Sequence, residues 1–214
     1  MRALSVIALA GLAACSSLTH YEPQGYIVRS GDTLYSIAWR HGLDHRDLAR
    51  WNGLTDPNRI VVGQRLVFTT QVSSQPASRP GTQSRPVNAS APVFSWPSRG
   101  NIVARFGERG ILTTGIGIAG RVGQEILAAA PGRVVYAGDG LPDYGQLAII
   151  EHNESWLTAY GHNRSLAVAQ GQTVSRGQKI GEMGLGPGRE PRLYFEIRRN
   201  GDPLDPLGLL PDSD

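Results

Sequence analysis

Few residues in this sequence have the chemistry of a catalytic or metal-binding group. The chain contains five histidines and one cysteine. A hydrolytic zinc site needs three protein ligands and one open position for water. Only His152 and His162 lie in the carboxyl-terminal half, and no Gly-x-Ser-x-Gly turn or convincing carboxylate pair accompanies them. The inventory therefore argues against a hydrolytic centre of the common types.

The single cysteine, Cys15, lies where a leader would be cleaved. A positive charge and a short apolar run precede it, and that run is too short to cross a bilayer. The phrase Leu12-Ala13-Ala14-Cys15 resembles a bacterial lipobox, which implies removal of residues 1–14 and lipid on Cys15. Residues 15–24 would form a tether, and Ser16 favours the periplasmic face of the outer membrane. The alternative is an ordinary secretory leader with an incidental cysteine.

The composition limits the remaining classes. Among 214 residues, 40% are hydrophobic and 18% are charged, which is ordinary for a globular protein. The formal net charge is only +3, and no dense run of basic residues occurs. We therefore expect no nucleic-acid partner. The 27 glycines and 14 prolines indicate many turns, and one cysteine excludes an internal disulfide framework.

Residues 25–69 have the pattern of a small β-α-α-β module. Strand-forming residues occupy 26–28, and a second strand is expected at 61–68. Asp32 is expected to cap a first helix that begins at Thr33 and ends at Gly42. Asp44 is expected to cap a second helix, which Asn52-Gly53 would end. This order predicts an α+β fold for the module.

The motifs of this module, Tyr26-x-Val28-x-x-Gly31-Asp32-Thr33-Leu34 and Val62-Gly63-Gln64-x-Leu66, make it resemble a LysM domain. The resemblance implies binding to peptidoglycan, a polymer that contains N-acetylglucosamine. The sugar groove would lie between the loops that follow the first strand and precede the second. For Asp32 and Thr33, helix capping is the competing role, and one residue can do both. The implied groove residues are Gly31, Asp32, Thr33, Asn58, Arg59 and Ile60.

Residues 70–92 are rich in proline and serine and contain neither aromatic nor acidic residues. Such a composition buries no core. We therefore expect a disordered linker between the LysM module and the rest of the chain.

Residues 93–211 have the pattern of an all-β domain. Short apolar runs alternate with glycine-containing turns, and no long amphipathic helix is visible. This pattern predicts an antiparallel sandwich or an open barrel. The expected strands are 102–106, 126–130, 133–136, 147–151, 157–160, 179–183 and 193–198.

Several phrases, among them Tyr160-Gly161-His162 and Leu193-x-Phe195-Glu196-Ile197-Arg198, make this domain resemble the LytM or lysostaphin-type peptidoglycan endopeptidases. Active members bind zinc through two histidines and an aspartate. The resemblance places Thr113, Gly117 and Tyr194 at the three ligand positions, and Arg192 at a catalytic histidine position. His162 retains its catalytic-type identity. We therefore expect no metal, no cofactor and no peptidase activity.

A lipobox, a LysM module, a linker and a degenerate LytM domain together resemble the NlpD group of cell-division lipoproteins. The resemblance implies that the chain activates an N-acetylmuramoyl-L-alanine amidase in cell separation without hydrolysing peptidoglycan itself. The alternatives are an endopeptidase with an atypical site and an inert tether between outer membrane and wall. The expected partner-binding groove consists of Thr113, Gly117, His162, Arg192 and Tyr194.

The lipobox predicts that Cys15→Ala removes the lipid, because the sulfur is the acylated atom. We expect the variant to move from the outer-membrane fraction to the soluble fraction after cell lysis. Ser16→Ala is the matched control and should stay with the membrane. Unchanged membrane recovery of the Cys15 variant would contradict the lipobox.

Overall fold

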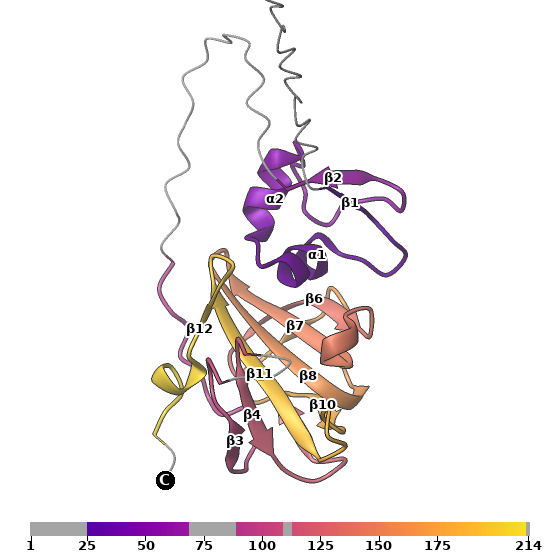
Figure 1. Ribbon diagram of the computed structural model, residues 1–214. Helices are drawn as coiled ribbons and strands as arrows, with labels where there is room; N and C mark the ends of the chain where they lie inside the picture. Colours follow the sequence, from indigo (N-terminus) through magenta and orange to yellow (C-terminus); the bar gives the residue numbers. More distant parts are fainter. Residues whose placement is uncertain (1–24, 69–88, 109–112, 213–214) are drawn as a thin grey trace, which may run out of the picture.

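The computed structural model describes residues 25–68, 89–108 and 113–212, which form two modules (Figure 1). Cys15 and most of the expected linker lie outside the described residues, and the expected domain limits stay predictions. Within the described part of the chain, no helix is long and apolar enough to cross a membrane.

The amino-terminal module has the β-α-α-β order expected from its sequence. Strands β1 and β2 pair antiparallel, with Tyr26 opposite Leu66. The strand expected at 61–68 is shorter than predicted, because the chain first turns at Val61–Gln64, where Gly63 has a φ of 87°. The elements are β1 (Gly25–Ile27), α1 (Leu34–His41), α2 (His45–Trp51) and β2 (Arg65–Val67).

The first helix begins one residue later than predicted, and Thr33 caps it in place of Asp32. The Thr33 hydroxyl accepts from the Ser36 backbone N–H at 3.0 Å, and the Ser36 hydroxyl accepts from the Thr33 N–H at 3.0 Å. Asp32 instead accepts bonds from the Tyr26 hydroxyl and the Arg29 N–H, both at 2.8 Å. Asp32 thus closes the loop before the helix, a role that competes with capping for its two oxygens.

The remaining helix boundaries follow the sequence expectations. Gly42 ends α1 in the left-handed region at φ 65°, which a glycine adopts without steric cost. Asp44 caps α2 through the Arg46 N–H at 2.8 Å, and the helix ends before Asn52. Leu34, Ile37 and Ala38 are buried in the core of this module, as their spacing predicts.

The second module is an antiparallel β domain, as predicted. Its strand order is β3-β4-β11-β8-β7-β6-β9, while β10 pairs with β5 and β8, and β12 pairs with β11. Two short 3-10 helices, η1 (Pro142–Tyr144) and η2 (Pro206–Gly208), lie between strands. The strands are β3 (Ile102–Ala104), β4 (Ile116–Ala119), β5 (Glu125–Leu127), β6 (Gly132–Gly138), β7 (Gln146–Asn153), β8 (Trp156–Leu166), β9 (Thr173–Val174), β10 (Lys179–Met183), β11 (Arg192–Arg199) and β12 (Asp202–Leu204).

Several strands begin or end at other residues than expected, because pairing with neighbouring strands sets their ends and local composition does not. Strand β8 runs far past the predicted end at Tyr160, because its polar second half still pairs with β7 and β10. Strand β5 stops before Ala128, whose N–H bonds to the carbonyl of Gln178 outside the strand ladder. Three strands, β4, β9 and β12, were not expected as strands.

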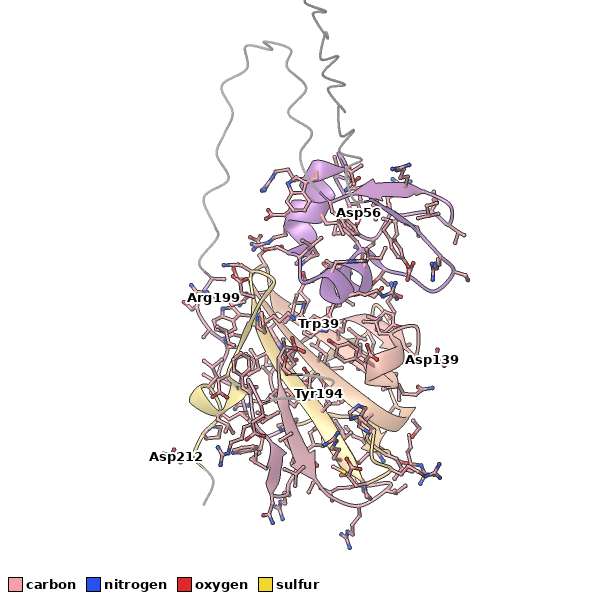
Figure 2. The ribbon with its side chains drawn as sticks, viewed as in Figure 1. Trp39, Asp56, Asp139, Tyr194, Arg199 and Asp212 are labelled. Atoms are coloured by element: carbon pink, nitrogen blue, oxygen red, sulfur yellow. The ribbon has the colours of Figure 1, made fainter. Side chains whose placement is uncertain are left out.

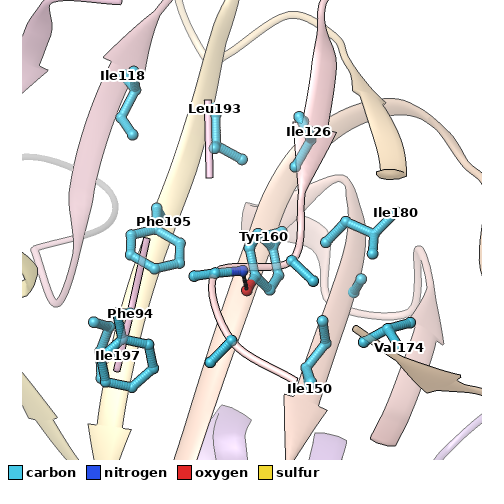
Figure 3. Packing of buried hydrophobic residues seen from close by; sticks show 14 of the residues in the cluster. Phe94, Ile118, Ile126, Ile150, Tyr160, Val174, Ile180, Leu193, Phe195 and Ile197 are labelled. Atoms are coloured by element: carbon cyan, nitrogen blue, oxygen red, sulfur yellow. Dashed lines mark hydrogen bonds between the residues drawn. The ribbon is translucent and has the colours of Figure 1, made fainter. Parts of the chain in front are cut away.

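One face of the sheet covers a core of aliphatic and aromatic side chains (Figure 3). Tyr160 lies at its centre, and its hydroxyl accepts the backbone N–H of Ala129 at 2.9 Å. Burial raises the pKa of Tyr160 to about 12, so the phenol stays neutral. His152, which is partly buried, bridges two segments, with Nδ1 2.8 Å from the Pro131 carbonyl oxygen and Nε2 2.8 Å from the Thr158 hydroxyl oxygen.

The opposite face of the sheet packs against helix α1 of the LysM-like module (Figure 1). Tyr35 and Trp39, one turn apart on α1, are buried against this face. The covered surface of the β domain is apolar. It consists of Val135, Tyr136, Leu141, Leu147, Ile149, Leu157 and Ala159, with Tyr144 at its edge.

Polar contacts surround this intermodule core. The Tyr35 hydroxyl donates to Glu151 Oε1 at 2.9 Å, and Arg40 donates to the Gly140 carbonyl at 2.8 Å. Arg46 reaches Asn200 at 2.7 Å. Gly201 permits the close approach, because a Cβ there would lie 2.7 Å from the backbone N of Asp44. The two modules therefore share an interface with an apolar centre and a polar rim.

The intermodule interface predicts that acid destabilises the folded chain. Burial lowers the pKa of His45 to about 4, so its protonation favours the unfolded chain, where the pKa is about 6.5. The contribution of neutral His45 to the free energy of unfolding is fully present above the unfolded-state pKa of about 6.5. It is lost as the pH falls from about 6.5 towards 4. At pH 5 the loss is no more than about 2 kcal/mol for this residue. Urea midpoints at pH 7 and pH 5 measure it.

His45→Phe keeps the aromatic ring on Tyr35, whose centroid lies 4.3 Å away, and removes the titrating group. We expect this variant to lose less free energy of unfolding between pH 7 and pH 5 than the parent chain loses. Burial also lowers the pKa of the more exposed His41, so His41→Phe is the comparison variant and should reduce the loss less than His45→Phe does. An equal loss in the parent and in His45→Phe would show that His45 does not carry this sensitivity.

Candidate functional site

Strand β11 presents two different faces because successive residues of a strand alternate in direction. Leu193, Phe195 and Ile197 point into the core of the β domain. The alternate set, Arg192, Tyr194, Glu196 and Arg198, therefore lies on the face that helix α1 partly covers. Figure 2 shows Trp39 at the base of the LysM-like module and Tyr194 further along the sheet.

Glu196 is the central residue of this face, and its exposed fraction is 0%. Arg198 Nε donates to one carboxylate oxygen at 2.6 Å, and the Tyr194 hydroxyl donates to the other at 2.6 Å. Burial raises the pKa of Glu196, while the Arg198 charge and the bond from Tyr194 oppose that rise. Arg198 and Tyr194 thus occupy both oxygens of the carboxylate.

Tyr194 fills the place where the family resemblance puts a metal ligand. Its side chain is only 4% exposed, and Thr114 Oγ1 lies 3.0 Å from its hydroxyl oxygen. Burial and the neighbouring carboxylate both raise the pKa of Tyr194, so the phenol stays neutral. A Cβ on Gly115 would lie 2.8 Å from the tyrosine ring. Glycine at this position therefore makes room for the tyrosine.

Gly117 lies directly opposite Tyr194 in the β4–β11 pairing. A Cβ on Gly117 would come within 3.1 Å of the Ala104 Cβ, so the structure has little free space beside this glycine. Neighbouring strand β3 occupies that space.

His162 lies in a bulge of β8, where the stretch Tyr160–Asn163 pairs with the shorter stretch Gln146–Ala148 of β7. Its φ is 61°, a left-handed conformation that is uncommon for a non-glycine residue and that bulges often impose near functional sites. Its ring centroid lies 6.0 Å from that of Tyr194. Burial lowers the pKa of His162, and the Asp143 backbone and the Arg192 charge act in opposite directions on it.

The remaining groove residues are more accessible. Thr113 is exposed, next to the Thr114 that contacts Tyr194. The Arg192 side chain is 22% exposed, and its Nε lies 3.2 Å from Glu190 Oε1. Tyr194 thus has Gly117 opposite it and the His162 ring beside it, both buried, while Arg192 and Thr113 are more accessible.

The residues present do not fit the zinc that the family resemblance implies. Among the described residues, no three histidine, cysteine, aspartate or glutamate side chains gather as a metal site. An imidazole, His162, and a carboxylate, Glu196, lie beside Tyr194, and the Glu196 oxygens are already bonded to Arg198 and Tyr194. Arg192 adds positive charge beside His162. This chemistry opposes a bound cation.

Of the predicted sugar-binding residues, Gly31, Asn58 and Arg59 are exposed, whereas Thr33 is buried. Gly31 is exposed with a φ of 84°, and Asp32 and Thr33 hold the loop and the start of α1. Asn58 and Arg59 are exposed in a turn that Asp56 fixes by accepting from the Asn58 N–H at 2.9 Å. Ile60 packs on the core of the module.

Sequence reasoning missed four residues that matter to the groove. Thr114 bonds to Tyr194, and the Tyr144 ring lies 5.5 Å from the Tyr194 ring in an edge-on arrangement. Trp39 and Arg198 meet across the two modules, with the guanidinium carbon 3.8 Å from the centre of the tryptophan ring. The phrase that contains Tyr144 was part of the family pattern, whereas nothing in the local sequence pairs Trp39 with Arg198.

The chain matches two known families, one for each module. Residues 112–206 match the model of Peptidase family M23, and residues 26–69 match that of the LysM domain. The predicted resemblances of the two modules are therefore confirmed.

Relatives with both modules are also found. The chain is 43% identical to the lipoprotein NlpD/LppB homolog of Pseudomonas aeruginosa, over 87% of this chain and 76% of that protein. It is 33% identical to the murein hydrolase activator NlpD of Escherichia coli, over 89% of this chain and 69% of that protein. The solved structure of Helicobacter pylori Csd3 is 28% identical with a TM-score of 0.50, over 56% of this chain and 34% of that chain.

The site geometry predicts that the purified full-length chain contains no stoichiometric zinc and cleaves no peptidoglycan. Thr113, Gly117 and Tyr194 offer no set of three good ligands, and Tyr194 is held by Glu196. Elemental analysis of the chain, purified with and without added zinc, measures the metal. One tightly held zinc per chain, together with cleavage that a chelator abolishes, would overturn this prediction.

Proposed function

Because the chain belongs to the NlpD family of lipoproteins, we propose that it activates a peptidoglycan amidase and hydrolyses nothing itself. Its relatives carry the name murein hydrolase activator. The partner we propose is an N-acetylmuramoyl-L-alanine amidase, which the groove around Arg192 and Tyr194 would contact. The outer membrane, reached through lipid on Cys15, is the proposed location.

The observation that carries this proposal is the filled metal site. In a fold matching a peptidase family, the ligand position at Tyr194 holds a neutral phenol bonded to a buried carboxylate. The strands that form the site, β4, β8 and β11, nevertheless keep their pairing. A domain that keeps these paired strands and loses the metal chemistry is suited to binding a protein.

Activation needs a difference in affinity. An activator must bind the active conformation of its amidase more tightly than the inactive one, since equal affinity for both shifts nothing. Arg192 is the groove residue best suited to such a contact, because its guanidinium is partly exposed and offers a planar set of donors. Arginine and tyrosine are also frequent among residues that dominate protein interfaces.

The LysM module supports the second part of the proposal, in which the chain holds peptidoglycan while its partner cleaves it. The exposed loops at Gly31 and at Asn58–Arg59 would contact the glycan. Binding of both wall and amidase by one chain would raise the local concentration of the enzyme at its substrate.

The match to Peptidase family M23 favours one rival, an endopeptidase with an atypical site. The absence of a three-ligand cluster among the described residues opposes it. An inert tether would bind the wall and leave amidases unaffected, so an activation assay separates it from the proposal.

We expect Arg192→Ala to weaken amidase binding roughly thirtyfold and to abolish activation at low concentration. Truncating a hot-spot arginine to alanine costs about 2 kcal/mol of binding free energy, which corresponds to roughly thirtyfold weaker binding. The assay uses the full-length chain, a purified N-acetylmuramoyl-L-alanine amidase and dye-labelled peptidoglycan, with released dye as the readout.

Arg164→Ala is the matched control. Arg164 is likewise an arginine of the β domain beside a glutamate, with Nε 3.6 Å from Glu182 Oε2, but it lies outside the predicted groove. Both variants should pellet with insoluble peptidoglycan as the parent does. If Arg192→Ala activates as well as Arg164→Ala, the groove is not the contact surface. If the parent chain activates no amidase, the tether is the better description.

A further inference from the structure

The LysM and LytM modules meet on the same sheet face that carries the groove. The intermodule core covers this face of β6, β7 and β8, next to the Arg198 end of β11. The groove residues Arg192 and Tyr194 lie at the other end of the same strand face. The peptidoglycan-binding module is therefore packed beside the groove and not on a remote surface.

A continuous set of short contacts joins the LysM module to Tyr194 in the groove. The Arg198 guanidinium carbon lies 3.8 Å from the centre of the Trp39 ring, and Arg198 Nη1 donates to the Trp39 carbonyl at 2.9 Å. Arg198 Nε donates to Glu196 at 2.6 Å, and Tyr194 donates to the other oxygen of Glu196 at 2.6 Å. Three side-chain contacts thus lead from the LysM module to Tyr194.

A second route leads through Tyr144. Its ring stands edge-on to Tyr194 with centroids 5.5 Å apart, and Tyr144 packs at the edge of the intermodule core to which Trp39 belongs. Trp39, which is 3% exposed, therefore reaches Tyr194 by an electrostatic route and by a packing route.

We infer that Trp39 of the LysM module is a positioning residue for the groove of the LytM domain, acting on Tyr194 through Arg198 and Glu196. The tryptophan ring and carbonyl fix the guanidinium, the guanidinium fixes the carboxylate, and the carboxylate fixes the phenol. Trp39 also excludes water from the Arg198–Glu196 pair, and such pairs interact more strongly in a dry environment. The groove is then a property of both modules together.

The same helix links this chain of contacts to the proposed sugar-binding loop. Thr33 caps α1 at one end, and Arg40, the neighbour of Trp39, bonds to Tyr26 at 2.6 Å and to the Gly140 carbonyl at 2.8 Å. Tyr26 in turn donates to Asp32 in the loop. Helix α1 therefore contacts the glycan loop, the β domain and the groove route.

This inference rests on the proposed function in taking Tyr194 as part of the surface that an amidase contacts. Its test measures the environment of Tyr194 in the full-length chain. Tyr194 is replaced by 3-fluorotyrosine, and the fluorine NMR resonance is recorded. We expect Trp39→Ala to shift and broaden that resonance and to weaken amidase binding about tenfold. Arg198→Lys should do the same, because lysine keeps the charge beside Glu196 and loses the planar contact with Trp39.

Two further variants separate positioning from general loosening of the interface. Tyr35→Phe removes the bond to Glu151 in the same interface and leaves the route to Tyr194 intact, so it should not move the resonance. Trp39→Phe keeps an aromatic ring over Arg198 and should restore most of the parent signal. Binding to insoluble peptidoglycan should be unchanged in all four variants.

The outcomes also separate this inference from the proposed function. An unmoved resonance in Trp39→Ala and Arg198→Lys overturns the inference, even if Arg192→Ala still abolishes activation. An equal shift in Tyr35→Phe overturns it too, since the effect would then follow interface loosening. A resonance that moves as expected, in a chain that activates no amidase, upholds the positioning route and removes the proposed function.

Discussion

A carboxylate with no exposed surface constrains everything around it. Burying an ionised group without partners costs several kcal/mol or more, and removing one partner of a buried pair costs about 3–5 kcal/mol. Glu196 meets this requirement with Arg198 on one oxygen and Tyr194 on the other. Arg198 is itself buried and needs acceptors of its own, and one of these is the Trp39 carbonyl of the other module. The LysM-like module therefore supplies part of the hydrogen bonding of the buried ion pair.

The same constraint explains how a peptidase fold keeps its shape without a metal. A bound cation would be the largest positive charge in such a site and would hold the surrounding strands through its ligands. Here the Arg198 guanidinium supplies the positive charge, Tyr194 donates to Glu196, and the Thr114 hydroxyl donates to Tyr194 and so joins β11 to the segment before β4. Gly115 and Gly161 admit the tyrosine ring, since a Cβ on either would approach it within 3.4 Å. Tyr194 at the ligand position therefore packs only because Gly115 and Gly161 beside it have no side chains.

Local patterns predicted what local physics determines. The buried spacing of Leu34, Ile37 and Ala38, the glycine at Gly42 and the cap at Asp44 were all visible in the sequence and are found in the structure. The cap of α1 was misassigned because Asp32 and Thr33 are both good caps, and only the bond from Tyr26 to Asp32 decides between them. The extent of β8 and the bulge at His162 depend on partners in β7 and β10 that lie elsewhere in the chain. Thr114 and Tyr194 are separated by 80 positions, and no periodicity connects them.

Helix α1 is buried on two sides, which indicates that it packs against more than its own module. Every residue from Leu34 to Trp39 is buried, although a helix on the surface of a small module needs only one buried stripe. Leu34, Ile37 and Ala38 face the core of the LysM module, whereas Tyr35 and Trp39 face the β domain. Two apolar stripes on one eight-residue helix require two partners, and a single small module provides only one. The second partner is the sheet face whose other end carries Arg192 and Tyr194, so the helix that begins at the proposed glycan loop packs on the same face as the residues that the amidase is proposed to contact. Binding at either end of such a shared element changes the free energy of binding at the other end by the same amount, wherever the element has two arrangements.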